Sequence, residues 1–198
     1  MDAAILAGGR ARRFGGRDKS SLDVGGASIL DRQRAALRSV AGRIFVVSGN
    51  PAPYQERGLE AVADLVPGAA SLGGIYTALA HATAEQVLVV ACDLPFLTAS
   101  FLRRLASEAH PGDEAVVPRS ADGWQPLCAV YSRGLAEPAR RQIEAGRLKI
   151  VDFLAAARVR EIGPEAIAEH DPDGLLFFNV NSPADWQLAN QLAASRGR

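Results

Sequence analysis

Cysteine and histidine are scarce in this sequence, and their scarcity argues against several kinds of protein. The 198 residues include two cysteines and three histidines. Cys92 and Cys128 are too few and too far apart for a disulfide framework or a Cys-x-x-Cys metal site. Each lies in an apolar, strand-like run, so we expect both to pack in the core. The histidines are scattered without the spacing of zinc ligands, so we expect no zinc site.

The chain also lacks long apolar segments and an excess of charge of either sign. No apolar run approaches about 20 residues, and the N-terminus shows no charged leader followed by an apolar segment and a cleavage site. We therefore expect a cytoplasmic protein with no membrane partner. The 22 basic residues balance the 22 acidic ones, whereas nucleic-acid-binding domains carry a broad basic footprint. We therefore expect no nucleic-acid partner.

What the chain does contain is an alternation of strand-like and helix-like segments. Residues 87–92 are apolar without alternation, as in a central parallel strand that is buried on both faces. Helices are predicted at 28–40, from about 73, at 98–109, 135–145, 150–157 and from 182, and strands at 3–6, 43–48, 59–65, 86–91, 115–117, 127–131 and 159–162. This order predicts an α/β fold with a doubly wound, mostly parallel sheet. A chain of 198 residues fits one domain, 1–198, since single cores stop growing at roughly 250 residues.

A basic, glycine-rich segment follows the first predicted strand. Gly8 and Gly9 lack a Cβ atom, so the backbone there can bring its N–H groups close to a polyphosphate. Between positions 10 and 19 the chain then carries five cations, Arg10, Arg12, Arg13, Arg17 and Lys19. Guanidinium and ammonium groups both neutralise phosphate oxygens. The segment therefore predicts a phosphate-binding loop.

Two common phosphate loops are excluded by spacing. The P-loop requires a lysine directly after a glycine, but Lys19 follows Asp18, and the fingerprint Gly-x-Gly-x-x-Gly is absent. The segment in this chain reads Leu6-Ala7-Gly8-Gly9-x3-Arg13-x-Gly15-Gly16-x-Asp18-Lys19-x2-Leu22. This motif resembles the signature of the molybdenum cofactor guanylyltransferase family of nucleotidyltransferases. The resemblance continues in Ser71-Leu72-Gly73-Gly74-Ile75, Cys92-Asp93-Leu94-Pro95-Phe96, Gln125-Pro126-Leu127 and Phe178-Asn179-Val180-Asn181-Ser182-Pro183, which spans nearly the whole chain.

Polar residues follow several predicted strands, and in open parallel sheets ligands bind outside the carboxyl ends of the strands. These positions are Gly8-Gly9, Asn50, Asp64, Asp93 and Asn179. Asp93 follows the most apolar strand. Mg²⁺ prefers one or two carboxylates together with phosphate and water, so we expect Asp93 to hold a Mg²⁺ that bridges triphosphate oxygens. An ordinary turn-capping role for Asp93 is the alternative.

The resemblance implies roles for further residues. It implies a Rossmann-like nucleotidyltransferase fold and nucleotide contacts from Leu6, Ala7, Gly8, Gly9, Lys19, Asn50, Asp64, Leu72, Gly73 and Asp93. Arg13 and Lys19 would stabilise the leaving pyrophosphate, and Asp93 would also contact magnesium. On the pterin side the candidates are Asn179 and Asn181, together with the basic residues Arg147 and Lys149.

The implied reaction transfers GMP from GTP to the phosphate of molybdopterin or the molybdenum cofactor. Pyrophosphate leaves, and the partners would be GTP, the pterin and, transiently, proteins that supply the cofactor or receive it. The segments Leu6–Gly9 and Leu72–Gly74 resemble the guanine branch rather than the related cytidylyltransferases. Two alternatives stay open: a nucleotidyltransferase that uses CTP or another phosphorylated acceptor, and a non-catalytic nucleotide-binding module on the same fold.

Overall fold

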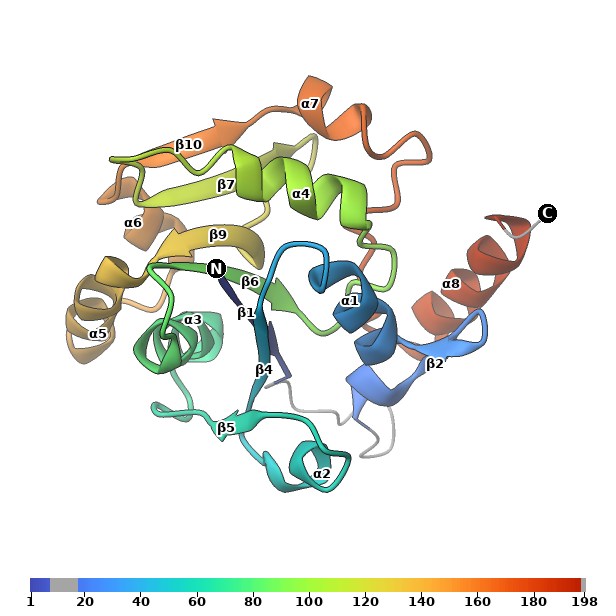
Figure 1. Ribbon diagram of the computed structural model, residues 1–198, viewed down its shortest axis with the longest axis horizontal. Coiled ribbons are helices and arrows are strands. Elements are labelled where there is room, and N and C mark those ends of the chain that lie inside the picture. The colour runs from blue at the N-terminus through green and yellow to red at the C-terminus, as the bar shows by residue number, and fades with distance from the viewer. Residues whose placement is uncertain (8–17, 197–198) are drawn as a thin grey trace.

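An eight-stranded sheet forms the centre of the structure, a computed structural model that describes residues 1–7 and 18–196 (Figure 1). Its strands are β1 (Asp2–Leu6), β4 (Arg43–Ser48), β5 (Ala61–Ala63), β6 (Gln86–Ala91), β7 (Ala115–Ser120), β8 (Gly123–Trp124), β9 (Cys128–Ser132) and β10 (Val159–Ile162). They follow the order β10-β7-β9-β6-β1-β4-β5, with β8 paired to β7. β6, β1, β4 and β5 are parallel neighbours, whereas β9 runs antiparallel to β6 and β7. The predicted mostly parallel sheet is confirmed.

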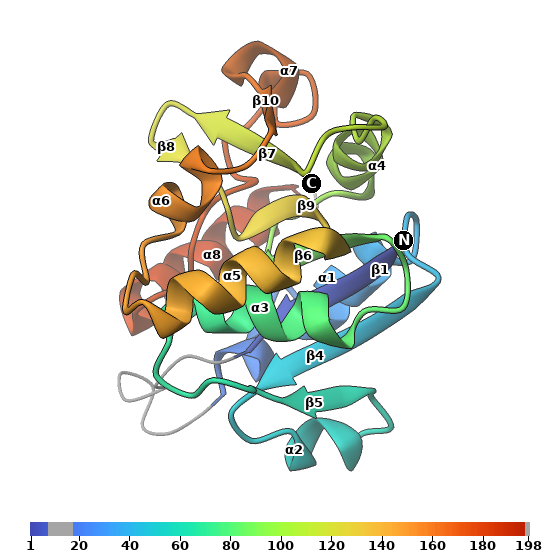
Figure 2. The same cartoon turned by 90° about the vertical axis from the view of Figure 1, so that its left-hand side faces the viewer.

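Helices cover both faces of this sheet, which confirms the doubly wound arrangement. They are α1 (Ile29–Leu37), α2 (Ala52–Gln55), α3 (Ala70–His81), α4 (Ala99–Ser107), α5 (Ala136–Glu144), α6 (Ile150–Ala155), α7 (Pro164–Ala168) and α8 (Pro183–Arg196), with short 3₁₀ turns η2 (Lys19–Ser21) and η3 (Arg133–Leu135). Figure 2 shows α3 and α5 in front of the sheet, while α1 and α4 lie on its other side. None of these described helices has the length and apolar character needed to cross a membrane.

Alternation along the strands builds one apolar core on each face. On β1, Ala3 and Ile5 pack toward α1 and α4, and Ala4 packs toward α3 and α5. Cys92 and Cys128 are free and buried, as expected. A smaller apolar cluster lies under α8 and the hairpin of β2 (Asp23–Val24) and β3 (Ala27–Ser28).

Side-chain caps mark the helices that the sequence located best. Ser28 Oγ accepts the N–H of Asp31 at the start of α1, and Thr98 Oγ1 accepts the N–H of Phe101 at the start of α4. At α8 a capping box forms, since Ser182 and Asp185 each accept the other's backbone N–H, at 3.2 and 2.7 Å. These three helix starts confirm the prediction, because an oxygen at the N-cap is a strong local signal.

Three of the described helices differ from the prediction, and the two-residue strands β2, β3 and β8 were not predicted. Helix α3 begins at Ala70 rather than near Gly73, because its N-cap, Ala69, makes no side-chain cap bond that would mark the start. Leu72, Gly73 and Gly74 therefore lie inside the helix and not at its start. Helices α2 and α7 were not predicted; they span four and five residues, too short for a 3.6-residue period to be visible.

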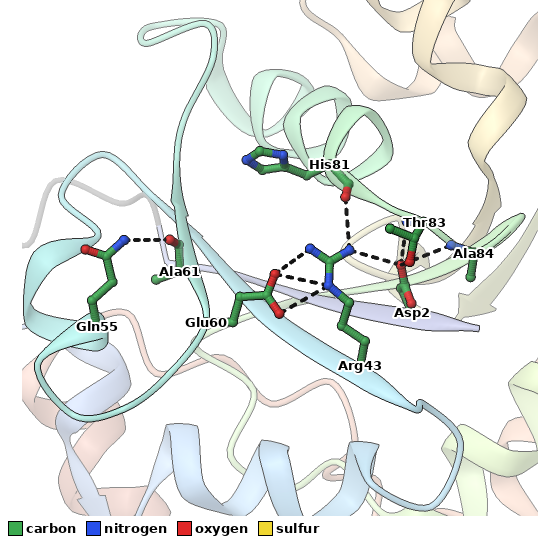
Figure 3. A network of polar contacts seen from close by, with 8 residues as sticks. All are labelled: Asp2, Arg43, Gln55, Glu60, Ala61, His81, Thr83 and Ala84. Atoms are coloured by element: carbon green, nitrogen blue, oxygen red, sulfur yellow. Dashed lines mark hydrogen bonds and ion pairs between the residues drawn. The ribbon is translucent and has the colours of Figure 1, made fainter.

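At the amino ends of the strands, Arg43 joins β4 to β1 and β5 (Figure 3). Its guanidinium donates to the Glu60 carboxylate and, at 3.3 Å, to Asp2 Oδ2. Asp2 Oδ2 also accepts the backbone N–H groups of Thr83 and Ala84 at 2.7 and 3.1 Å. Burial alone would raise the pKa of Asp2, but these hydrogen bonds and the Arg43 charge outweigh it and hold the pKa below 3.8. The network fixes the end of the sheet opposite to the strand exits.

We expect Asp2→Asn to lower the free energy of unfolding at pH 7 by about 2 kcal/mol, since hydrogen bonds to a charged group contribute roughly 1.5–3 kcal/mol. The folded chain holds the Asp2 proton less tightly than the unfolded chain, so the carboxylate stabilises the fold above pH 3.8. This contribution disappears as the pH falls through the lower folded-state pKa. Urea unfolding at pH 7, 4 and 3 measures it, with Asp122→Asn in an exposed turn as the control. A difference between Asp2→Asn and the parent that does not shrink with falling pH would contradict the expectation.

Candidate functional site

A pocket of about 250 Å³ opens at the carboxyl ends of the central parallel strands. Its lining residues come from the ends of β1, β4 and β6, from η2, from the start of α3 and from the segments after β5 and before β9: Leu6, Ala7, Asp18, Lys19, Val47, Ser48, Asp64, Ala70, Ser71, Gly74, Ala91, Cys92, Asp93 and Leu127. This edge is where open α/β sheets bind ligands. Four lining residues carry charged side chains, namely Lys19 and the three aspartates. The other lining residues have apolar or small side chains.

Lys19 and Asp93 meet at the wall of this pocket. The distance between Lys19 Nζ and Asp93 Oδ2 is 3.9 Å, and Nζ donates a hydrogen bond to Asn181 Oδ1 at 2.8 Å. Residues that are far apart in the sequence therefore converge on one ammonium group. Both charged side chains retain 19% of their surface exposed, which leaves them accessible to a ligand in the pocket.

One carboxylate oxygen of Asp93 is unpaired among the described residues. Its Oδ1 atom is buried, and within residues 1–7 and 18–196 it has no hydrogen-bond partner. Burial raises the pKa of the Asp93 carboxyl above 3.8, and the nearby Lys19 charge opposes the rise. A buried carboxylate oxygen without a donor costs free energy unless a ligand pairs with it. A divalent cation with hard oxygen ligands is such a partner, so Asp93 fits the Mg²⁺ that the sequence predicts there.

Asp18 holds the turn that presents Lys19. Its Oδ1 accepts the Ser20 N–H at 2.9 Å, and its Oδ2 accepts the Ser20 hydroxyl at 2.8 Å and the hydroxyl of Tyr54. Tyr54 comes from α2 and is almost fully buried. Burial and the Asp18 carboxylate raise the pKa of the Tyr54 hydroxyl, so it stays a donor at neutral pH. The turn that carries Lys19 is thus anchored to the core by the hydrogen bond between Asp18 and Tyr54.

Asp64 and the start of α3 form a second part of the pocket wall. Asp64 Oδ1 accepts the Val66 N–H at 3.0 Å and lies 3.1 Å from Thr77 Oγ1, which fixes the carboxylate at the exit of β5. Ala70, in a left-handed conformation with φ of 50°, and Ser71 begin α3 at the pocket. First-turn amides of a helix have no intrahelical acceptor, and α3 has no side-chain cap. This wall therefore offers amide donors beside a carboxylate acceptor.

Comparison with known proteins identifies the family. Residues 3–160 match the model of the MobA-like NTP transferase domain. The chain belongs to this family. The MobA-like match includes the strand exits and the Lys19 and Asp93 positions, and it confirms the resemblance found from the sequence motifs.

Relatives of known name cover nearly the whole chain. A protein of Pelotomaculum thermopropionicum named probable molybdenum cofactor guanylyltransferase is 36% identical over 96% of this chain and 91% of its own length. A molybdenum cofactor guanylyltransferase of Desulfosudis oleivorans is 34% identical over 100% and 99%. The crystal structure of molybdopterin-guanine dinucleotide biosynthesis protein A from Archaeoglobus fulgidus superposes with a TM-score of 0.84 at 27% identity, over 98% of this chain and all of the other. MobA-like architecture and sequence therefore agree.

The predicted site residues divide into three groups. Leu6, Ala7, Lys19, Asp64 and Asp93 line the pocket, and Asn181 reaches Lys19 from outside the lining. Four others are not among the lining residues: Asn50, Leu72, Gly73 and Asn179. Predicted residues Gly8, Gly9 and Arg13 lie outside the described part of the chain.

The predicted residues that miss the pocket do so for visible reasons. Leu72 is fully buried in the core below α3. A Cβ at Gly73 would lie 2.9 Å from the Ala69 Cβ and 3.0 Å from the Val66 carbonyl, so this glycine permits the close packing of the preceding loop against α3. Gly73 N–H already donates to Ala69, so it is not available to a base.

The predicted asparagines differ in whether they reach the site. Asn50 is exposed after β4. Asn179 is exposed in the connection between α7 and α8, where the structure has no strand, so its predicted position at a strand exit is wrong. Its Nδ2 donates to the carbonyl of Phe177. Arg147 and Lys149 lie exposed in the connection between α5 and α6, where the pocket lining has no member. Of the pterin-side candidates, only Asn181 is brought to the described site.

Sequence analysis missed the groups that hold the site residues in place. Asp18 stood inside the motif next to Lys19, but its role as a hydrogen-bond acceptor depends on Tyr54, which lies 36 positions further along. Thr77 and Asp64 lie 13 positions apart and meet only because α3 packs beside β5. No local pattern signals such contacts, since they arise from tertiary packing.

Proposed function

We propose that this protein transfers GMP from GTP to the terminal phosphate of molybdopterin or the molybdenum cofactor and releases pyrophosphate. The observation that carries the proposal is the convergence of Lys19 and Asp93 in a pocket at the strand exits. It occurs in a chain whose relatives over nearly their whole length are named molybdenum cofactor guanylyltransferases. We place the reaction in the cytoplasm and in one domain, with transient contacts to proteins that supply or receive the cofactor.

The chemistry needs positioning and charge neutralisation rather than a protein nucleophile. An oxygen of the acceptor phosphate attacks the α-phosphorus in line, and the bond to the oxygen that bridges toward the β-phosphorus breaks. The leaving pyrophosphate takes up the electron pair. The Lys19 ammonium, held by the Asp18 turn, lies where it can neutralise this developing charge. We assign the same task to Arg13 from the sequence motif.

Asp93 is the residue that would hold Mg²⁺ in this pocket. When bound there, Mg²⁺ neutralises phosphate oxygens as a Lewis acid. This assignment is supported by Asp93 Oδ1, which has no hydrogen-bond partner among the described residues.

Guanine offers an acceptor at O6 beside donors at N1 and N2, so a selective pocket must present N–H donors and a carboxylate or carbonyl acceptor. The wall formed by Asp64 and the first turn of α3 supplies both kinds of group. We expect GTP to bind at least about a hundredfold more tightly than CTP, since hydrogen-bonding sites reject mismatched partners by several powers of ten. Competition binding at matched Mg²⁺ measures this. CTP that displaces GTP at equal concentration would contradict the guanine assignment.

The test of the whole proposal is pyrophosphate release from purified protein incubated with molybdopterin, Mg²⁺ and each nucleoside triphosphate in turn. We expect release with GTP only when molybdopterin is present. Release with CTP instead would favour a cytidylyltransferase, and GTP binding without any release would favour a non-catalytic nucleotide-binding module.

A further inference from the structure

Gln33 is a buried polar residue that lies outside the pocket. It belongs to α1 and retains 1% of its surface exposed. Its Nε2 donates to the backbone carbonyl of Ala91 at 2.7 Å and to that of Leu94 at 3.0 Å. These two carbonyls stand on either side of Cys92 and Asp93. One side chain from α1 thus spans the turn that carries the Asp93 carboxylate.

The rest of this turn is held by the backbone. The Cys92 N–H donates to Leu6 at the end of β1, and the Asp93 carbonyl accepts the Val180 N–H. Among the hydrogen bonds of the described residues, Gln33 provides the side-chain support for the backbone of 91–94. The turn is therefore fixed from β1, from the segment before α8 and from α1.

Burial of the Gln33 amide oxygen costs free energy. Its Oε1 atom is buried and has no hydrogen-bond partner within the described residues. An apolar side chain of similar size would avoid burying this oxygen, but it would leave the carbonyls of Ala91 and Leu94 without the amide. The side-chain amide is therefore explained by its two donor contacts rather than by core packing.

We propose that Gln33 is a positioning residue that fixes the turn after β6 and thereby places the Asp93 carboxylate at the pocket wall. Asp93 Oδ1 has no described hydrogen-bond donor of its own, so its position depends on the backbone that carries it. The catalytic consequence rests on the proposed function, whereas the restraint of the turn does not. Loss of the amide should loosen residues 91–94 and weaken the binding of a divalent cation.

Gln33→Met tests this, because methionine has a similar size and no donor. Gln33→Asn is the second variant, since it retracts the amide by one methylene and cannot span both carbonyls. Gln142→Met is the matched control: Gln142 is also buried, and its Nε2 donates to a backbone carbonyl, that of Lys149, away from the pocket. Urea unfolding of each variant separates local loosening from a loss of global stability.

Hydrogen exchange of the backbone amides in 92–97, which all these residues except Pro95 possess, is the first readout and needs no ligand. We expect exchange about 25-fold faster in Gln33→Met, which loses two hydrogen bonds of about 1 kcal/mol, or about fivefold, each. Exchange should be intermediate in Gln33→Asn and unchanged in Gln142→Met. The second readout is Mn²⁺ binding with GTP present, followed by electron paramagnetic resonance. Its dissociation constant should rise about tenfold in Gln33→Met. The Gln33→Met protein should then need a higher Mg²⁺ concentration to reach its half-maximal rate. At saturating Mg²⁺ its kcat should be close to that of the parent.

Unchanged exchange at 92–97 in Gln33→Met would overturn the proposal, and so would an increase spread evenly over the whole chain. An increase confined to this turn with unaltered Mn²⁺ binding would overturn the link to Asp93. Absence of turnover in the parent protein with every nucleoside triphosphate would instead contradict the proposed function, and the exchange result would still decide the role of Gln33.

Discussion

Asp93→Asn protein should release pyrophosphate from GTP at least about a hundredfold more slowly than the parent while unfolding at the same urea concentration. Cation-assisted neutralisation of phosphate charge contributes several kcal/mol to phosphoryl transfer, and each 1.36 kcal/mol corresponds to about tenfold in rate. The amide keeps the shape of the carboxylate but lacks its charge. Stability should survive because Asp93 Oδ1 is buried and has no partner in the described part of the chain, so its charge does not favour folding. Steady-state pyrophosphate release and urea unfolding measure the two effects.

The control for this variant is Asp152→Asn. Asp152 is an exposed aspartate in the first turn of α6, and it is not among the residues that line the pocket. Its loss removes the same unit of charge from the protein and should leave the rate within about twofold. If Asp93→Asn retains the parent rate, Asp93 has no part in the mechanism and its alternative role as a turn cap stands. If it loses stability as well as rate, the rate alone does not assign a role.

The alternation of strands and helices could be predicted because its signals are local. The run 87–92 lacks any polar position, and the strands flanking it have short apolar stretches of the same kind. Ser28, Thr98 and Ser182 mark helix starts within one residue of the structure, because each forms its cap with a group three positions away. Where the cap is missing, as at α3, the predicted start was three residues late. The antiparallel direction of β9 also depends on pairing with β6, which no local pattern specifies.

The site could be predicted only in part, and for a related reason. Asp64 and Asp93 were found because they directly follow strands that share one edge of the sheet. Asn50 follows a strand too, but its backbone turns away through bonds with Ser48 and leaves the side chain outside the pocket lining. Position after a strand thus fixes the edge of the sheet but not the direction of the side chain. Gln33 and Tyr54 act across the fold, and their roles follow only from the packing of α1 and α2.

Lys19→Ala should lower kcat by roughly a hundredfold to a thousandfold with a smaller change in the KM for GTP. A cation aimed at charge that develops in the transition state contributes on the order of 3 kcal/mol, whereas ground-state binding of GTP also draws on the other groups of the pocket. The Lys19 ammonium lies 2.8 Å from Asn181 Oδ1 and 3.9 Å from Asp93 Oδ2, so it is already aligned with the groups assigned to the reaction. Steady-state kinetics at saturating Mg²⁺ and molybdopterin measure the split between kcat and KM.

Two further variants distinguish a directed charge from a diffuse positive field. Arg103→Ala removes an exposed cation from α4, away from the pocket lining, and should leave kcat unchanged. Tyr54→Phe keeps Lys19 but removes the hydroxyl that donates to Asp18. It should lower kcat by about five- to tenfold, because a lost hydrogen bond to a charged acceptor costs roughly 1.5 kcal/mol or somewhat less when part of the turn persists. Equal losses in Lys19→Ala and Arg103→Ala would mean that the pocket uses only net positive charge. If kcat falls in Lys19→Ala but not in Tyr54→Phe, the lysine acts without support from the Asp18 turn. If kcat falls in both variants, the Asp18 turn and the Lys19 ammonium act together.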